Sequence, residues 1–146
     1  MSLTMTPTER EAFLADLHVG ILSVADQGGR PPLSVPIWYM YEPGGGLSFI
    51  TGRGSRKVPL IRSAGGFTVC VQTEVQPYRY VTVEGSLTVV EDTSDADRRA
   101  MADRYLGREE GGRYFASTPP DEVRESVTIR MRPERWLTAD FSRQQR

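Results

Sequence analysis

Short apolar runs separated by glycine- and proline-rich turns make up most of the chain. In the first half, Pro36 interrupts one run. Because proline has no N–H to donate, we expect that strand to lie at a sheet edge or to carry a bulge. A Pro43-Gly44-Gly45-Gly46 turn leads into the next run, so we expect the second and third runs to pair as an antiparallel hairpin. The three strands expected in this half are 19–25, 33–41 and 47–51.

The second half carries longer runs of strand type. Between residues 80 and 90, apolar and polar positions alternate, with Val81 and Val83 on one side and Thr82 on the other. This alternation is typical of a strand whose two faces differ in burial. A break that contains proline, at 76–78, separates this run from the one before it. Strands are expected here at 67–75, 80–90, 127–131 and 135–141.

Three short helices interrupt the strands. Thr6 provides a hydroxyl cap and Pro7 occupies the first turn, which together predict a helix start. Phe13, Leu14 and Leu17 then recur at helical spacing and define the face expected to be buried. The other two helices are expected at 56–63, with Ser55 as cap, and from Ser94 to about Leu106, where Gly107 ends the helix.

Six or seven strands in hairpin order, without long crossover helices between them, favour an antiparallel barrel over a doubly wound parallel sheet. A chain of 146 residues fits one domain. Residues 1–146 are therefore expected to form a single, mainly β barrel with short flanking helices. The chain contains no internal repeat and no low-complexity tract.

The composition is that of an ordinary globular protein, with 38% hydrophobic and 25% charged residues and a formal net charge of −1. This charge offers no general attraction to nucleic acid. No stretch is apolar enough for a membrane helix, and the polar N-terminus lacks the pattern of a signal peptide. The single cysteine, Cys70, fits a reducing cytoplasm, and the single histidine, His18, argues against a transition-metal site. We expect a cytoplasmic, metal-free protein.

The most informative stretch for chemistry runs from Phe49 to Lys57. A strand ends near Thr51, a glycine turn follows, and a helix begins near Ser55 and Arg56. A helix start offers N–H groups and a partial positive charge, and the hydroxyl and two cations add further donors, so the segment suits a phosphate. The alternative interpretation is that the cations face water and the serine only caps the helix.

Two other groups of residues have simpler interpretations. Alternation places Tyr39 and Tyr41 on one face of their strand and Trp38 on the other, and we favour core and interface packing over stacking on a ligand. A cluster of three aspartates and two arginines is expected to form a solvated helix face. This cluster comprises Asp92, Asp95, Asp97, Arg98 and Arg99.

Three segments together resemble the pyridoxamine-phosphate-oxidase-like split barrels that bind FMN. The strand, the turn and Ser55-Arg56-Lys57 are similar to the phosphate-binding element of that family. Residues 79–85 (Arg-Tyr-Val-Thr-Val-Glu-Gly) are similar to its Arg-Gln-Val-Arg-Ile/Val-Glu-Gly strand, and residues 129–136 resemble its closing strand pair. The segments occur in the family's order, and the resemblance covers about residues 11–141. It implies a six- to seven-stranded antiparallel split β-barrel.

The resemblance also implies a homodimer that holds two cofactors at the interface between its subunits. The implied cofactor-binding residues are Thr51, Ser55, Arg56 and Lys57 at the phosphate, Pro36 and Trp38 beside the ring system, Arg79 and Tyr80 near the cofactor, and Trp136 reaching across from the partner subunit.

Two departures separate this chain from the true pyridoxamine oxidases. Tyr80 stands where they carry a glutamine that helps to hold FMN, and the tail from Asp140 to Arg146 lacks their Arg-His-rich substrate segment. The resemblance is greater to the actinobacterial branch of flavin- and deazaflavin-dependent oxidoreductases. The implied cofactor is coenzyme F-420 or FMN. Arg53 and Arg62 are additional cations that would suit the acidic tail of the deazaflavin.

In such a protein the cofactor supplies the hydride chemistry, while the barrel supplies orientation, electrostatics and water exclusion. The expected function is an oxidoreductase that transfers a hydride between the bound cofactor and a small organic substrate, and no catalytic side chain is identified. The alternative is a non-catalytic protein that stores or carries a flavin, haem or lipid in the same groove. A third interpretation is a barrel that acts only in protein association.

Overall fold

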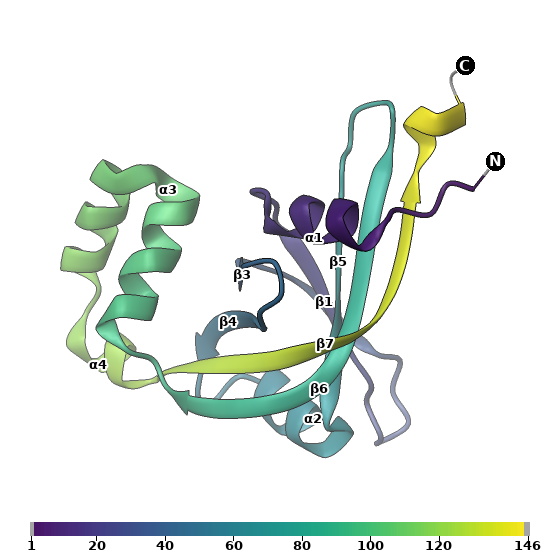
Figure 1. Cartoon of the computed structure of the whole chain (residues 1–146). Coiled ribbons are helices and arrows are strands. Elements are labelled where there is room, and N and C mark those ends of the chain that lie inside the picture. The colour runs from purple at the N-terminus through teal and green to yellow at the C-terminus, as the bar shows by residue number, and fades with distance from the viewer. Residues whose placement is uncertain (1, 145–146) are drawn as a thin grey trace.

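The computed structural model describes residues 2–144, and in it seven antiparallel strands form one strongly curved sheet that does not close into a full barrel (Figure 1). The order of the strands across the sheet is β2-β1-β5-β6-β7-β4-β3. The elements in chain order are α1 Pro7–Ala15, β1 Gly20–Val24, β2 Leu33–Ile37, β3 Met40–Tyr41, β4 Leu47–Gly52, α2 Lys57–Ala64, β5 Gly66–Gln72, β6 Arg79–Asp92, α3 Asp95–Ser117, α4 Pro120–Arg124, β7 Ser126–Asp140 and the 3-10 helix η1 Phe141–Gln144. The mainly β, split antiparallel barrel is confirmed.

Two of the expected strands have different limits. The run 33–41 is divided, since β2 pairs with β1 and only β3 pairs with β4. The predicted hairpin is therefore wrong for β2, which is instead an edge strand, and an edge tolerates Pro36. The two C-terminal runs form one strand, β7, because a bulge between Pro133 and Arg135 takes up the irregularity while pairing with β6 continues.

The inward-facing side chains of the sheet form the hydrophobic core, which α1 and α2 extend. Phe49 of β4 and Phe67 of β5 meet edge to face, with ring centroids 5.4 Å apart. The buried Tyr39 hydroxyl donates to the Leu14 carbonyl oxygen at 2.6 Å, which ties α1 to the chain between β2 and β3. Burial also raises the pKa of Tyr39.

Two glycines allow three strands to pass close to one another. A Cβ atom at Gly66 would collide with the Gly85 carbonyl, and a Cβ atom at Gly85 would collide with the Arg132 carbonyl. Gly85 also lies at a register shift between β6 and β7. These close approaches accompany the pronounced bend of β6 and β7 that Figure 1 shows.

α1 begins as predicted but ends early. The Thr6 hydroxyl accepts from the backbone N–H of Glu9, and the Glu9 carboxylate accepts from the backbone N–H of Thr6, which forms a capping box. The helix ends at Ala15, so Leu17 lies beyond it and is 60% exposed. The prediction that Leu17 belongs to the buried face is therefore wrong.

α2 begins one residue later than predicted. Arg56 occupies the N-cap position, and the Ser55 N–H donates to the Gly52 carbonyl at 2.9 Å, so Ser55 closes the preceding turn. The prediction of Ser55 as the cap is wrong because this turn is one residue longer than the sequence pattern indicates. At the other end of the helix, Gly65 terminates it with a φ of 78°, as predicted.

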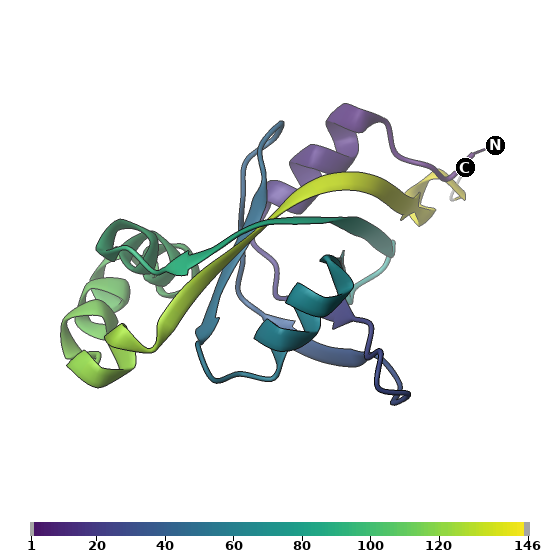
Figure 2. The same cartoon turned by 90° about the horizontal axis from the view of Figure 1, so that it is seen from below.

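α3 consists of two helical segments joined at Gly107, whose φ of 81° breaks the helix where the sequence predicts an end. Figure 2 shows both segments gathered with α4 to one side of the sheet. The sequence pattern predicts no helix at the position of α4. Within residues 2–144, none of the helices has both the length and the apolar character needed to cross a membrane.

Candidate functional site

A cavity of about 460 Å³ is lined by residues of β4, α3 and α4. Figure 1 shows where these elements lie. The sheet side of the cavity is formed by residues 36–38 and 50–52, and Lys57 contributes from the start of α2. The opposite wall comes from α3, α4 and the beginning of β7. Four predicted cofactor-binding residues meet here, namely Pro36, Trp38, Thr51 and Lys57.

Lys57 is the predicted cation that the fold directs into this cavity. Its ammonium group donates to the Ser55 hydroxyl at 3.1 Å, and the Lys57 backbone N–H approaches the same oxygen at 3.3 Å. Ser55 does not line the cavity, so its contribution is to hold the lysine. An ammonium group has three donors, and an anion in the cavity could therefore accept from Lys57 while the serine contact persists.

Arg56 is directed away from the cavity. Its guanidinium donates to the Asp26 carboxylate at 2.5 Å, which links α2 to the turn between β1 and β2. The backbone N–H of Gly28, together with Arg56, holds the pKa of Asp26 below its usual range. Because its guanidinium is bound to Asp26 and Arg56 does not line the cavity, Arg56 does not reach an anion beside Lys57.

The start of α2 offers few unpaired backbone donors. The Lys57 and Val58 N–H groups both point to Ser55, at 3.3 Å to the hydroxyl and 3.1 Å to the carbonyl. Pro59 has no N–H at all. Within this structure an anion would therefore be held mainly by side chains, rather than by the helix start that the sequence pattern suggests.

Arg98 of α3 is a second cation in the cavity, and it was missed by the sequence analysis. Its side chain is only 14% exposed and lies over the Phe115 ring at 4.2 Å, while one terminal nitrogen donates to Asp95 at 3.2 Å. Within residues 2–144 its buried Nε has no hydrogen-bond partner. The expectation that this cluster is a solvated helix face is wrong for Arg98. The error arises because the covering Phe115 lies beyond the kink of α3.

Trp38 forms an aromatic wall with α3. Its indole stacks on the Tyr105 ring with centroids 4.8 Å apart and an interplanar angle of 3°. The Tyr105 hydroxyl donates to the His18 carbonyl at 2.6 Å and accepts from the Tyr39 N–H at 3.1 Å, which fixes the helix against the sheet. Trp38 remains 37% exposed, whereas Tyr39 and Tyr41 are buried, so the alternation predicted for this segment is confirmed.

Three other predicted residues lie outside this cavity. Arg79 and Tyr80 begin β6, whereas the cavity lies near its far end, roughly 40 Å away along the strand. The Arg79 guanidinium lies 5.4 Å from the Phe13 ring. Trp136 of β7 lies under the Arg10 guanidinium and lines a different cavity. Within one chain, the fold does not bring these residues to Lys57.

Comparison with known proteins places the fold. The sequence pattern of the pyridoxamine 5'-phosphate oxidase family matches residues 6–139, nearly the whole chain. The chain belongs to this family. None of the curated proteins matches the sequence.

Several solved structures of other proteins share the fold of this chain, although their sequence identity to it is low. An F-420 reductase is 24% identical over 87% of this chain and 94% of its own, with a TM-score of 0.72. A conserved hypothetical protein of Mycobacterium tuberculosis is 18% identical over 99% of this chain and 91% of its own, with a TM-score of 0.79. An FAD-binding protein of Mesorhizobium loti is 20% identical over 92% of this chain and 94% of its own, with a TM-score of 0.62. At these identities the likeness shows the fold alone.

Histidine and cysteine chemistry has no evident place in the cavity. Among the described lining residues there is neither a histidine nor a cysteine. His18 stacks on Phe13, and its Nε2 lies 2.9 Å from the Phe13 carbonyl oxygen. No group of three His, Cys, Asp or Glu side chains within residues 2–144 is arranged to hold a metal ion.

Proposed function

We propose that this protein is an oxidoreductase that binds FMN or the deazaflavin coenzyme F-420 in the cavity between β4 and α3. The proposal rests on the observation that Lys57, Thr51 and Arg98 line one cavity. Trp38, which stacks on Tyr105, gives this cavity an aromatic wall. Family membership and the printed names of the F-420 reductase and the FAD-binding protein support a flavin-type cofactor.

The residues present fit such a group. A volume of about 460 Å³ lies within the usual range for small-molecule sites. Lys57 and Arg98 supply positive charge, alongside the carboxylates of Glu122 and Glu125 that also line the cavity, and the Thr51 hydroxyl can donate a hydrogen bond. The two cations would bind a phosphate. Trp38 and the apolar residues of α3 would exclude water from a flat ring. The arginine is already held by Phe115, so it would lose little side-chain freedom on binding.

When bound, a flavin or deazaflavin would supply the hydride chemistry. The contribution of this chain would be to bind the phosphate, to orient the ring against the Pro36–Trp38 segment and to shield it from water. The substrate of this hydride chemistry would be a small organic molecule that enters the same space. The cavity offers no histidine among its described lining residues, which agrees with a mechanism carried by the cofactor.

We also propose a homodimer with the cofactor at its interface. Arg79, Tyr80 and Trp136 lie away from the cavity of their own chain, so a second copy is needed to bring them to the cofactor. The outer face of the sheet exposes a cross-strand row of Ile21, Cys70, Thr82 and Leu137. In this row Ile21 is 42% and Leu137 is 63% exposed, as expected of a face that another subunit covers. A cytoplasmic location is part of the same proposal, because Cys70 is a free thiol.

The second candidate function is a carrier that holds a flavin, haem or lipid without turning it over. A carrier needs no proton donor, and among the described lining residues there is neither a histidine nor a cysteine. A carrier and an oxidoreductase would bind the cofactor alike. Only the oxidoreductase would reoxidise a pre-reduced bound cofactor faster when an organic acceptor is added in the absence of oxygen.

The test of the site is equilibrium binding of FMN and of coenzyme F-420, measured side by side by fluorescence. Lys57→Ala should weaken binding by about 10-fold or more, because a hydrogen bond to a charged group contributes roughly 1.5–3 kcal/mol. The matched control is Arg30→Ala, which removes an exposed cation from the turn between β1 and β2, outside the lining of the cavity, and should leave affinity unchanged. Equal affinity of the Lys57 variant and the parent protein would disprove the assignment of the cavity.

A further inference from the structure

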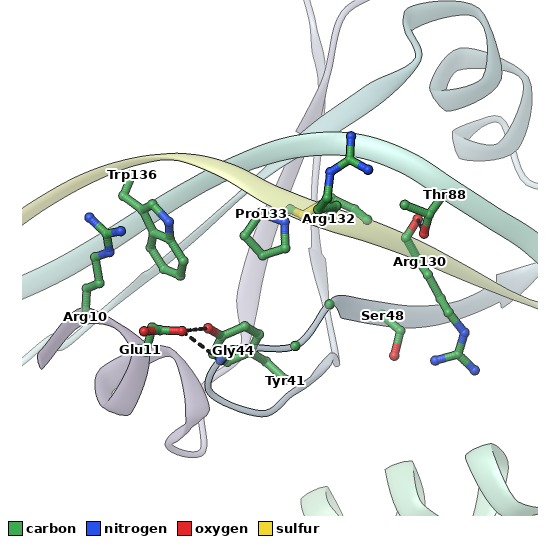
Figure 3. Close-up of a pocket in the computed structure, with 13 residues that line it drawn as sticks. Arg10, Glu11, Tyr41, Gly44, Ser48, Thr88, Arg130, Arg132, Pro133 and Trp136 are labelled. Carbon is green, nitrogen blue, oxygen red and sulfur yellow. Dashed lines mark hydrogen bonds between the residues drawn. The ribbon is translucent and has the colours of Figure 1, made fainter. Parts of the chain in front are cut away.

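A second cavity, of about 530 Å³, opens where the barrel is split (Figure 3). β4 pairs with β7 only as far as Met131. Beyond that residue, and within residues 2–144, the edge of β7 on the β4 side has no strand partner. α1 and the turn between β3 and β4 stand across this gap. The cavity therefore lies between an unpaired stretch of β7 and α1, and it shares no lining residue with the Lys57 cavity.

Arg10 of α1 lies at one end of this cavity without a carboxylate partner. Its guanidinium carbon is 4.6 Å from the centroid of the Trp136 ring, and Figure 3 shows the two side chains next to each other. Its Nε is buried and has no hydrogen-bond partner within residues 2–144. Arg10 takes part in none of the ion pairs formed within the same residues. A buried donor without an acceptor favours the binding of a group that supplies one.

The neighbouring Glu11 is engaged elsewhere. Its Oε1 accepts from the Tyr41 hydroxyl at 2.9 Å and from the Gly44 N–H at 2.7 Å, as the dashed lines in Figure 3 show. The Gly44 N–H and the Tyr41 hydroxyl hold the pKa of Glu11 below its usual value. Glu11 therefore ties the β3–β4 turn to α1 and shapes the wall, while the buried Nε of Arg10 has no acceptor among the residues that the structure describes.

The two other arginines of the cavity are already compensated. Arg130 bonds to Glu91 and Asp97, at 3.3 and 2.7 Å. Arg132 bonds to Glu134 at 3.0 Å. They nonetheless add positive potential, since the lining holds three arginines and one glutamate.

Apolar groups line the space between these charges. The Trp136 ring and the Pro133 ring face the cavity from β7, and Tyr41 meets Trp136 edge to face with centroids 6.3 Å apart. Such surfaces favour a flat apolar group over a strongly hydrated one. The site thus combines one uncompensated guanidinium with an aromatic and aliphatic wall.

We propose that this cavity binds a small aromatic carboxylate. The carboxylate accepts hydrogen bonds from the Arg10 guanidinium, whose fork of donors matches its two oxygens. The ring lies against Trp136 and Pro133. The site shares no lining residue with the cofactor cavity of its own chain. Because the proposed homodimer would bring Trp136 near the cofactor of a partner subunit, the proposal requires that the carboxylate and that cofactor occupy separate spaces.

The first experiment titrates benzoate into the whole protein by isothermal calorimetry, with benzamide as the neutral isostere. Benzoate should bind at one site per chain, and benzamide should bind at least about 10-fold more weakly, since it lacks the charge that Arg10 recognises. This comparison uses the unmodified protein and does not depend on the folding of a variant. Equal binding of the two molecules, or no binding of benzoate, would overturn the proposal.

Variants then test in which cavity benzoate binds. Arg10→Met should lose benzoate affinity by at least about 10-fold, whereas Arg62→Met, on an exposed helix surface, should keep it. Lys57→Ala should also keep it, because Lys57 lines the other cavity. Unchanged affinity in the Arg10 variant, or lost affinity in the Lys57 variant, would contradict the placement.

Competition experiments test the chemistry and the occupant. Acetate and inorganic phosphate should displace benzoate only at much higher concentrations, because neither offers a ring to Trp136. Displacement by phosphate at equal concentration would show a general anion site and refute the aromatic part of the proposal. Displacement by saturating FMN or coenzyme F-420 would show that the cavity belongs to a partner subunit's cofactor site, and would refute its independence.

Discussion

Replacement of Arg98 by Met separates binding from stability in the cofactor cavity. Arg98 is held between the Phe115 ring and Asp95, with its side chain 14% exposed and its Nε without a partner in residues 2–144. Methionine keeps much of the apolar volume and removes the charge. The affinity for a phosphate-bearing cofactor should therefore fall, while the fold should be affected little.

The magnitudes follow from the contacts. Loss of a charge-assisted hydrogen bond to the cofactor phosphate corresponds to roughly 1.5–3 kcal/mol, or about 10- to 150-fold in the dissociation constant. The free energy of unfolding loses a cation–π contact and an exposed ion pair, together about 1–2 kcal/mol. It gains a similar amount, about 1–3 kcal/mol, because an unsatisfied buried N–H is removed. The net change should lie between a loss of about 1 kcal/mol and a gain of about 2 kcal/mol, which is at most roughly 4–8 °C in Tm.

The assay pairs two measurements on the same samples. Fluorescence titration with FMN and with coenzyme F-420 gives the dissociation constants, and thermal unfolding without ligand gives Tm. Arg99→Met is the matched control, because Arg99 is adjacent, pairs with Asp103 at 2.9 Å and does not line the cavity. The control should keep its cofactor affinity.

Two results would refute this reasoning. If Arg98→Met bound the preferred cofactor as tightly as the parent protein, the arginine would not face the phosphate. If instead the variant lost more than about 3 kcal/mol of stability, Arg98 would be a structural residue whose buried charge is compensated in the fold. In that case a loss of affinity of about 10-fold or more could not be assigned to a direct contact.

Three further predictions concern stability and its pH dependence. Tyr39→Phe should lower the free energy of unfolding by about 1–3 kcal/mol in urea titrations, because it leaves the buried Leu14 carbonyl without a donor, and an unchanged midpoint would contradict this. The Arg143 guanidinium and the Thr6 N–H lower the pKa of Glu9 to about 2 from 4.5, so their stabilising contribution is present above pH 4.5 and is lost as pH falls toward 2. Arg143→Gln should make the acid-induced loss of stability shallower over this window, and parallel pH profiles of variant and parent would count against it. Gly85→Ala should lower the free energy of unfolding by at least about 1–3 kcal/mol, because a Cβ there collides with the facing carbonyl of β7, and a Tm equal to that of the parent protein would be the contrary result.

Local patterns in the sequence predict most of the elements. The hydroxyl and proline at Thr6 and Pro7 determine where α1 begins, and Gly65 and Gly107 end helical segments where expected. These features depend on residues within one or two turns of each other, so the sequence alone carries the information. Pro36 likewise indicates an edge strand, since a missing donor is tolerated there wherever the rest of the sheet lies.

Strand partners could not be predicted in the same way. The sequence pattern pairs the run 33–41 with its nearest neighbour, whereas β2 joins β1. Which neighbours pair depends on the packing of the whole sheet, because isolated hairpins are only marginally stable. The bulge that joins the last two runs into β7 similarly depends on continued pairing with β6.

The same distinction between local patterns and distant partners applies to the residues of the candidate site. Thr51 and Lys57 are close in sequence, so the strand, the turn and the helix start already indicate that they share an end of the barrel. The tertiary structure alone decides that Arg56 turns to Asp26, that Arg98 enters the cavity and that Arg10 lies over an indole from the far end of the chain. Arg56 and Arg10 meet partners 30 and 126 residues away in the sequence, Asp26 and Trp136. Arg98 is covered by Phe115, which only the kink of α3 brings back to it.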